Sequence, residues 1–227
     1  MSLLIKNAKI VNPSGVSAGD ILIENGIIQK IRKNIKLKEA DRIIDADPYY
    51  VLPGLIDMHT HLRSPGREDE ETIESGSYAA VKGGVTTLLC MPNTEYPLDN
   101  QQRISWVRET AGRVGIADIY PVGCITKERK GKELTEFGHL KEAGAIALSD
   151  DGSPVEDSLL LRRAMEYASA FNLLIISHCE DMSLSAEGIM RECAVSSEVG
   201  LPGIPSLAES IVVARELEMA RYLSTRI

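Results

Sequence analysis

Two histidines separated by one residue are the side chains of this sequence best suited to chemistry. They are His59 and His61, in the segment LPGLIDMHTHLRSPG that spans residues 52–66. Side chains of a strand alternate between its two faces, so both imidazoles project to one side. Two imidazoles on one rigid strand end can converge on a single cation. The pair, with Asp57 before it and a Pro-Gly loop after it, favours a metal site over two core histidines.

Polar residues follow three later apolar runs in a similar way. Asn93 ends the run in CMPN, and Asp150 and Asp151 follow the run in LSDDG. The run in ISHCED is followed by His178, Glu180 and Asp181. Each motif is weak alone, because DDG is usually a turn and a single histidine is usually a core residue. The carboxyl ends of parallel strands meet at one edge, so together these residues predict a shared site with the histidine pair.

A parallel sheet is needed to bring these residues together. Apolar runs at 51–59, 86–91, 117–125, 145–149 and 173–178 alternate with helix-like stretches at 73–82, 101–113, 132–142, 159–170 and 207–222. This alternation predicts an α/β fold in which helices cover a parallel sheet. Five such units fit an open doubly wound sheet or a barrel that lacks three units, because an eight-fold barrel takes about 250 residues.

The first 50 residues follow a different pattern. Short apolar runs flank Asn25-Gly26, a strong hairpin signal, and another short run covers residues 42–44. These features predict a small antiparallel β unit that precedes the α/β part.

Composition excludes several classes of function. The chain has 25 Lys+Arg and 33 Asp+Glu, a formal charge of −8, and 4% aromatic residues. An acidic chain without a basic cluster or stacking platform is not expected to bind nucleic acid or an anionic membrane. No apolar run reaches the roughly 18 residues of a membrane helix, and the start does not match a signal peptide. The four cysteines form no CxxC pair, so we expect reduced thiols and a cytoplasmic location.

The combined motifs resemble those of dihydroorotases in the amidohydrolase superfamily. The motifs are DMHTHLRSPG, MPN, SDDGSPV, SHCED and LPGIPSLAES, and the resemblance covers the whole chain. It implies a small N-terminal β-sandwich portion in residues 1–50. Residues 51–227 would form a TIM-type (β/α) barrel, with only about the first five β/α units present. It also implies a metal-dependent hydrolase that reversibly cyclises N-carbamoyl-L-aspartate to dihydroorotate in pyrimidine biosynthesis.

The resemblance assigns metal ligands residue by residue. His59 and His61 would bind one zinc ion, and His178 would bind a second. Asp151 would bridge the two ions and act in catalysis. A carboxylate is suited to bridging because each of its oxygens can bind one cation.

Substrate binding is implied for Arg63 and Asn93, together with His61. A guanidinium matches a carboxylate because its planar fork makes two parallel hydrogen bonds. From the residues alone we also expect Asp57 to orient a ligand imidazole. The expected partners are the small-molecule substrate, further copies of the chain in a homo-oligomer, and aspartate transcarbamoylase.

Other cyclic amidases and a non-catalytic role remain as alternatives. Hydantoinases and allantoinases are expected to carry a carboxylated lysine on the fourth barrel strand, and AIALSDDG contains none. That absence disfavours both enzymes. A further alternative is an inactive, dihydroorotase-like scaffold for a pyrimidine-pathway partner.

The family pattern continues beyond the motifs found here. It includes a metal-binding histidine at the end of strand six and an aspartate at the end of strand eight, and neither precedes Ile227. We therefore expect a further C-terminal segment to complete the barrel. Ser64 and Ser177 also differ from the residues usual at those positions.

Overall fold

The computed structural model describes residues 1–36 and 40–227. The chain divides into two compact units, Met1–Leu55 and Ile56–Ile227. The helices of the described part lack the combination of length and apolar character that a membrane span needs.

The N-terminal unit is built on one mixed sheet. Its strands are β1 (Ser2–Asn12), β2 (Gly15–Glu24), β3 (Ile27–Arg32), β4 (Arg42–Asp45) and β5 (Tyr50–Val51). The predicted hairpin is confirmed: β2 and β3 are antiparallel, and Asn25 and Gly26 have φ values of 51° and 79°. Such a two-residue turn requires positive φ at both positions. The prediction of a purely antiparallel unit is wrong, because β4 and β5 both run parallel to β1.

The second unit contains the predicted parallel sheet. Its strands are β6 (Leu55–Thr60), β7 (Val85–Cys90), β8 (Asp118–Gly123), β9 (Ala147–Leu148) and β10 (Leu174–Ile175). They lie in the order β10-β9-β8-β7-β6, so each strand neighbours the next one in the sequence of β/α units. This order brings the carboxyl ends of the strands to one edge.

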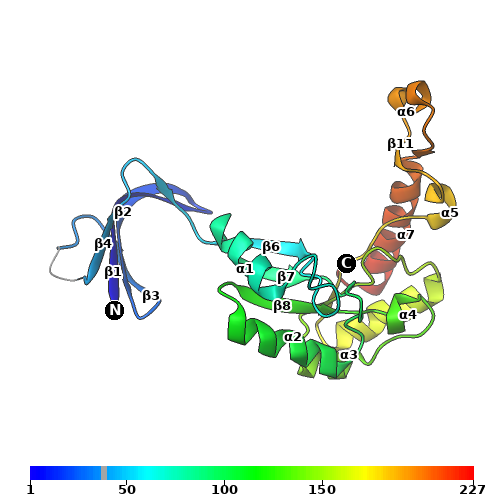
Figure 1. The fold of residues 1–227 in the computed structure, drawn as a ribbon, viewed down its shortest axis with the longest axis horizontal. Coiled ribbons are helices and arrows are strands. Elements are labelled where there is room, and N and C mark those ends of the chain that lie inside the picture. The colour runs from blue at the N-terminus through cyan, green and yellow to red at the C-terminus, as the bar shows by residue number, and fades with distance from the viewer. Residues whose placement is uncertain (37–39) are drawn as a thin grey trace. The chain divides into compact units, whose positions relative to one another are not determined.

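Helices cover one face of this sheet (Figure 1). They are α1 (Ile73–Lys82), α2 (Gln101–Val114), α3 (Phe137–Glu142), α4 (Ser158–Ala170) and α7 (Leu207–Leu223). The α1 bounds match the prediction because both ends carry local signals: Thr72 and Ser75 form a capping box, and Gly83 caps the other end. Helix α3 is shorter than predicted, since it begins only at Phe137.

Alternate residues of β7 and its end pack on opposite faces of the sheet. Leu88 and Cys90 join the large core beneath the helices. Leu89 and Met91 join a smaller cluster with Val122 on the other face. Both faces of the central strands are therefore apolar, which explains why these strands read as continuous apolar runs.

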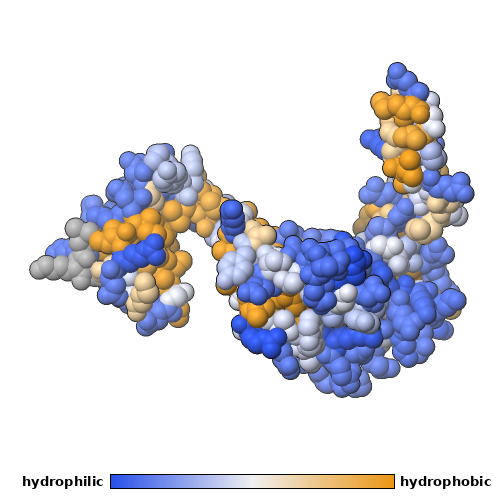
Figure 2. Space-filling model, viewed as in Figure 1, coloured by the Kyte–Doolittle hydropathy of each residue, from blue (hydrophilic) through white to orange (hydrophobic). Residues whose placement is uncertain are grey.

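Residues 181–206 form an excursion between β10 and α7 for which the sequence predicted no helix or strand. It contains α5 (Met182–Ser185), β11 (Met190–Arg191), α6 (Ala194–Val199) and β12 (Gly203–Ile204). These elements are too short to produce a recognisable periodicity. Figure 2 shows apolar surface around α6, where Ile189, Val195 and Val199 are exposed.

The core beneath the helices depends on Phe137. Its side chain is fully buried, and its ring stacks on Tyr167 of α4 with 4.7 Å between ring centroids. We expect Phe137→Ala to lower the free energy of unfolding by about 3–5 kcal/mol, because the lost ring leaves a cavity. Phe137→Leu fills most of that volume and should cost less. Chemical denaturation of both variants tests this, and equal losses would contradict the cavity explanation.

Candidate metal centre

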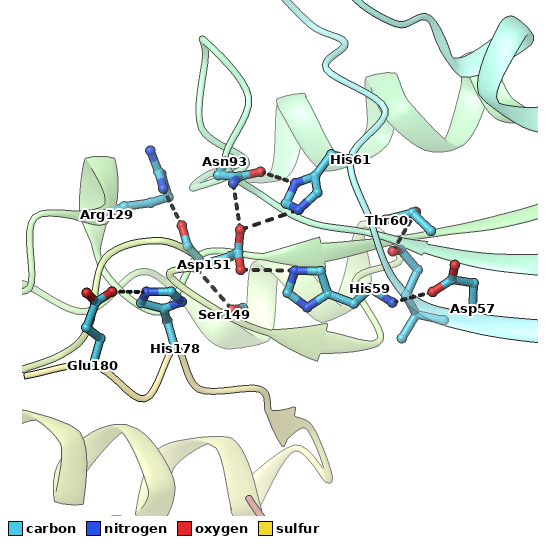
Figure 3. Close-up of polar contacts among 11 residues, drawn as sticks. Asp57, His59, Thr60, His61, Asn93, Arg129, Ser149, Asp151, His178 and Glu180 are labelled. Atoms are coloured by element: carbon cyan, nitrogen blue, oxygen red, sulfur yellow. Dashed lines mark hydrogen bonds and ion pairs between the residues drawn. The ribbon is translucent and has the colours of Figure 1, made fainter. Parts of the chain in front are cut away.

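The carboxylate of Asp151 lies between the two histidines of β6 and its end. Its Oδ1 is 3.1 Å from His59 Nε2, and its Oδ2 is 3.9 Å from His61 Nε2. One ligand atom from each of the three residues lies within 4.8 Å of the others. The Asp151 side chain is only 10% exposed. The structure therefore assembles three of the four predicted metal ligands into one group (Figure 3).

Strand geometry places the two histidines side by side. His59 lies in β6 and His61 directly follows it, and their ring centroids are 5.1 Å apart. Between them, the Thr60 hydroxyl donates a hydrogen bond of 2.9 Å to the carbonyl of Leu89 on β7. The Thr60 carbonyl also accepts one from the Met91 amide. These bonds fix the strand end, so the alternation holds both imidazoles on the Asp151 side.

Asn93 connects two members of this group. Its Nδ2 donates to Asp151 Oδ2 at 2.6 Å, and its Oδ1 lies 3.0 Å from His61 Nδ1. Since the amide oxygen can only accept, His61 Nδ1 carries the proton and His61 Nε2 presents a lone pair toward Asp151. Asn93 thus orients two predicted ligands, a role that the sequence did not suggest.

A second aspartate anchors the segment that carries Asp151. Asp150 is buried and accepts hydrogen bonds from the amides of Ile125 and Thr126, and from the Thr126 hydroxyl. Burial raises the pKa of Asp150, and the bonds from Thr126 oppose that change. On the other side, Arg129 of the 3₁₀ helix η2 (Lys127–Arg129) donates to the Asp151 carbonyl at 2.5 Å. The backbone that presents Asp151 is therefore held from two directions.

His178 lies outside the three-residue group but borders the same pocket. Its Nε2 is 2.8 Å from Glu180 Oε2. The pocket has a volume of about 840 Å³, within the range of small-molecule sites, and His59, Asp151, His178 and Glu180 all line it. The fourth predicted ligand thus faces the same space as the others.

Two further predicted residues make contacts other than those expected. Arg63 Nε lies 3.5 Å from Glu70 Oε2, and both side chains are partly exposed. Asp57 accepts a hydrogen bond of 3.1 Å from the backbone amide of His59. The expectation that Asp57 orients an imidazole is therefore wrong: its carboxylate fixes the backbone of the ligand-bearing strand instead.

The donor set fits a transition metal. Two imidazole nitrogens and a carboxylate oxygen are ligands that zinc accepts, and zinc enzymes leave one position open for water or substrate. Asn93 supplies the outer contact that commonly orients such ligands. Sequence reasoning assigned no role to Thr126, Arg129 or Glu180, because their contacts are made across loops that leave no periodic signal.

Residues 49–225 match the family described as dihydro-orotase-like. The chain belongs to the dihydroorotase-like family. It is 46% identical over 228 residues to a dihydroorotase of Thermoanaerobacter sp. (strain X514), covering 100% of this chain and 53% of that protein. It is 48% identical over 225 residues to a dihydroorotase of Syntrophus aciditrophicus (strain SB), covering 98% of this chain and 53% of that protein. The chain spans about half the length of the curated relatives it matches.

Solved structures establish the fold. An L-hydantoinase (dihydropyrimidinase) from Arthrobacter aurescens superposes with a TM-score of 0.79 at 22% identity, over 99% of this chain and 51% of that one. A D-hydantoinase superposes with a TM-score of 0.76 at 24% identity, over 99% and 51%. The predicted TIM-type barrel of the amidohydrolase kind is confirmed, with about the first five β/α units in this chain. An open doubly wound sheet is excluded.

The amide of Asn93 provides a direct test of the metal centre. Asn93→Ala removes both outer contacts, and we expect zinc affinity to fall about 10–100-fold. Asn93→Asp places a second carboxylate against Asp151 and replaces the donated hydrogen bond with repulsion of like charges. We expect the zinc affinity of both variants to differ from that of the unmodified protein. Competition with a chelator measures this affinity. Affinities equal to that of the unmodified protein would contradict this account.

Proposed function

We propose that the protein is a zinc-dependent dihydroorotase that interconverts N-carbamoyl-L-aspartate and dihydroorotate. The observation that carries this proposal is the His59–Asp151–His61 group at the carboxyl ends of parallel strands, in a chain of the dihydroorotase-like family. Relatives 46–48% identical bear the name dihydroorotase. The hydantoinase structures that superpose on this chain support its fold and nothing more.

In this proposal His59 and His61 would hold one zinc ion, His178 would hold a second, and Asp151 would help to hold both. Bound zinc would supply Lewis-acid polarisation of the ring amide and activation of the attacking water. In hydrolysis the water oxygen bonds to the amide carbonyl carbon, the C–N bond breaks, and the nitrogen takes a proton. Cyclisation is the reverse and releases water.

The chain's own residues prepare this reaction by orientation. The hydrogen bond from Asn93 Nδ2 fixes the rotation of the Asp151 carboxylate. Arg63 would hold the substrate carboxylate with its planar fork, exchanging its present partner Glu70 for the ligand. We propose residues 51–227 as the metal-dependent hydrolase domain, which a further barrel segment completes.

The proposal extends to location and assembly. All four cysteines are free thiols, which suits a cytoplasmic protein. A homo-oligomer and association with aspartate transcarbamoylase are the proposed assemblies. Gel filtration with light scattering, with and without the transcarbamoylase, would test them.

Activity and metal dependence test the central proposal. We expect the zinc-loaded full-length protein to hydrolyse dihydroorotate in preference to hydantoin and allantoin, and to lose activity reversibly on chelation. Asp151→Asn should lower kcat/KM at least about 100-fold, because it removes the charge and one metal-binding oxygen. Absorbance assays measure this, with metal analysis alongside. A protein that binds no zinc, or that prefers hydantoin, would refute the proposal.

Arg63 tests the assignment of the substrate carboxylate. Arg63→Gln removes a charge-assisted pair of hydrogen bonds, so we expect KM for dihydroorotate to rise about 10–100-fold. Arg63→Lys should give a smaller rise, since it keeps the charge and loses the fork. Glu70→Gln is the matched control, because it removes the carboxylate that pairs with Arg63 and Arg67 and leaves the Arg63 guanidinium in place. An unchanged KM in Arg63→Gln would exclude this role.

A further inference from the structure

An arginine of α7 holds the loop that leads from Asp151 to α4. Arg215 donates from Nη1 to the Glu156 carbonyl at 2.8 Å and from Nη2 to the Val155 carbonyl at 3.0 Å. These contacts join residues 59 and 60 positions apart in the sequence. A guanidinium presents its N–H groups in a planar fork, so one side chain can hold two adjacent carbonyls.

A buried carboxylate fixes Arg215 in turn. Glu216 Oε1 accepts from Arg215 Nη2 at 3.0 Å, and the Glu216 side chain is only 3% exposed. A buried carboxylate requires a charged partner, so the fold holds the guanidinium beside it. Arg221 on the same helix differs, because its side chain is 82% exposed and its Nη1 lies 3.8 Å from Glu218 Oε1. Arg215 is thus part of the packed protein, and Arg221 is a surface residue.

The segment between the Arg215 contacts and Asp151 is short and stiff. The Ser153 amide donates to the Asp150 carbonyl at 2.8 Å, which closes a turn around Asp151. The ring of Pro154 then restricts the backbone, and the Val155 side chain is buried in the core beneath the helices. A displacement of the carbonyls held by α7 would therefore be transmitted to the backbone of Asp151.

We propose that Arg215 is a positioning residue for Asp151, acting through the carbonyls of the loop that follows it. The inference rests on the proposed function, because it treats Asp151 as a metal ligand and a catalytic group. Arg129 holds the Asp151 carbonyl from the β8 side (Figure 3), and Arg215 holds the far end of the same loop from α7. With both ends held, the Asp151 carboxylate stays between the two histidines.

The kinetics of zinc-loaded full-length variants test this role. Arg215→Gln should lower kcat for dihydroorotate about tenfold, a typical contribution of a residue that supports a metal ligand. KM should stay within about twofold, since Arg63, proposed to hold the substrate carboxylate, follows β6 and lies on another segment. Arg215→Lys should give a smaller loss of kcat, because it keeps the charge beside Glu216 and loses the fork.

Two further measurements do not depend on activity. Competition with a chelator should show that Arg215→Gln binds zinc about tenfold more weakly than the unmodified protein. In the zinc-free protein, hydrogen exchange at the backbone amides of residues 151–156 should be faster in Arg215→Gln. Arg221→Gln is the matched control, because it makes the same change on an exposed part of the same helix. Its kcat and zinc affinity should stay within about twofold of the unmodified protein.

The outcomes separate positioning from a purely structural role. A purely structural role would lower the midpoint of chemical denaturation and leave kcat and zinc affinity of the folded protein unchanged, and that result would overturn the inference. Equal losses in Arg215→Gln and Arg221→Gln would also overturn it. If Arg215→Gln does not fold, Arg215→Lys decides, and values equal to those of the unmodified protein would refute the role. Failure of the unmodified protein to bind zinc or hydrolyse dihydroorotate would instead count against the proposed function.

Discussion

The second unit is organised around a buried carboxylate that must be satisfied. The carboxylate of Asp151 needs compensating partners in the folded protein, because burial of an unpaired charge costs free energy. Its oxygens meet the side chains of His59, His61 and Asn93, which come from the ends of two strands that neighbour each other in the sheet. A single negative group therefore draws together residues separated by up to 92 positions in the sequence.

The parallel sheet brings the side chains around Asp151 to one edge, and contacts from the loops then fix their positions. Strand order alone brings the residues to one edge, but it does not fix the position of each side chain. Asp150 removes that freedom through its bonds to the backbone after β8. Arg129 adds a bond to the carbonyl of Asp151. Catalytic geometry generally requires such supporting contacts, because a loosely held ligand set loses both affinity and rate.

Much of this site could be predicted from the sequence because it follows short-range rules. Residues two apart on a strand lie on the same face, so the spacing of His59 and His61 predicts that their rings are neighbours. The bounds of α1 follow from local capping at Thr72. The contacts of Glu180 and Asn93 could not be predicted in detail, since they depend on how loops from different units approach one another. The excursion at 181–206 was missed for a different reason: its elements span only two to six residues, too few for a periodic pattern to repeat.

The adjacent pair Asp150 and Asp151 has a consequence for how this chain can change in length. One carboxylate turns toward the β8 loop and the other toward the histidines, and Ser149 before them is tied to β8 through the Gly123 carbonyl. An insertion or deletion between Ser149 and Gly152 would exchange the directions of the two acids, leaving one network without an anion and the other with a misplaced one. A change of length within this four-residue stretch would therefore disturb the support of the site and the candidate ligand together.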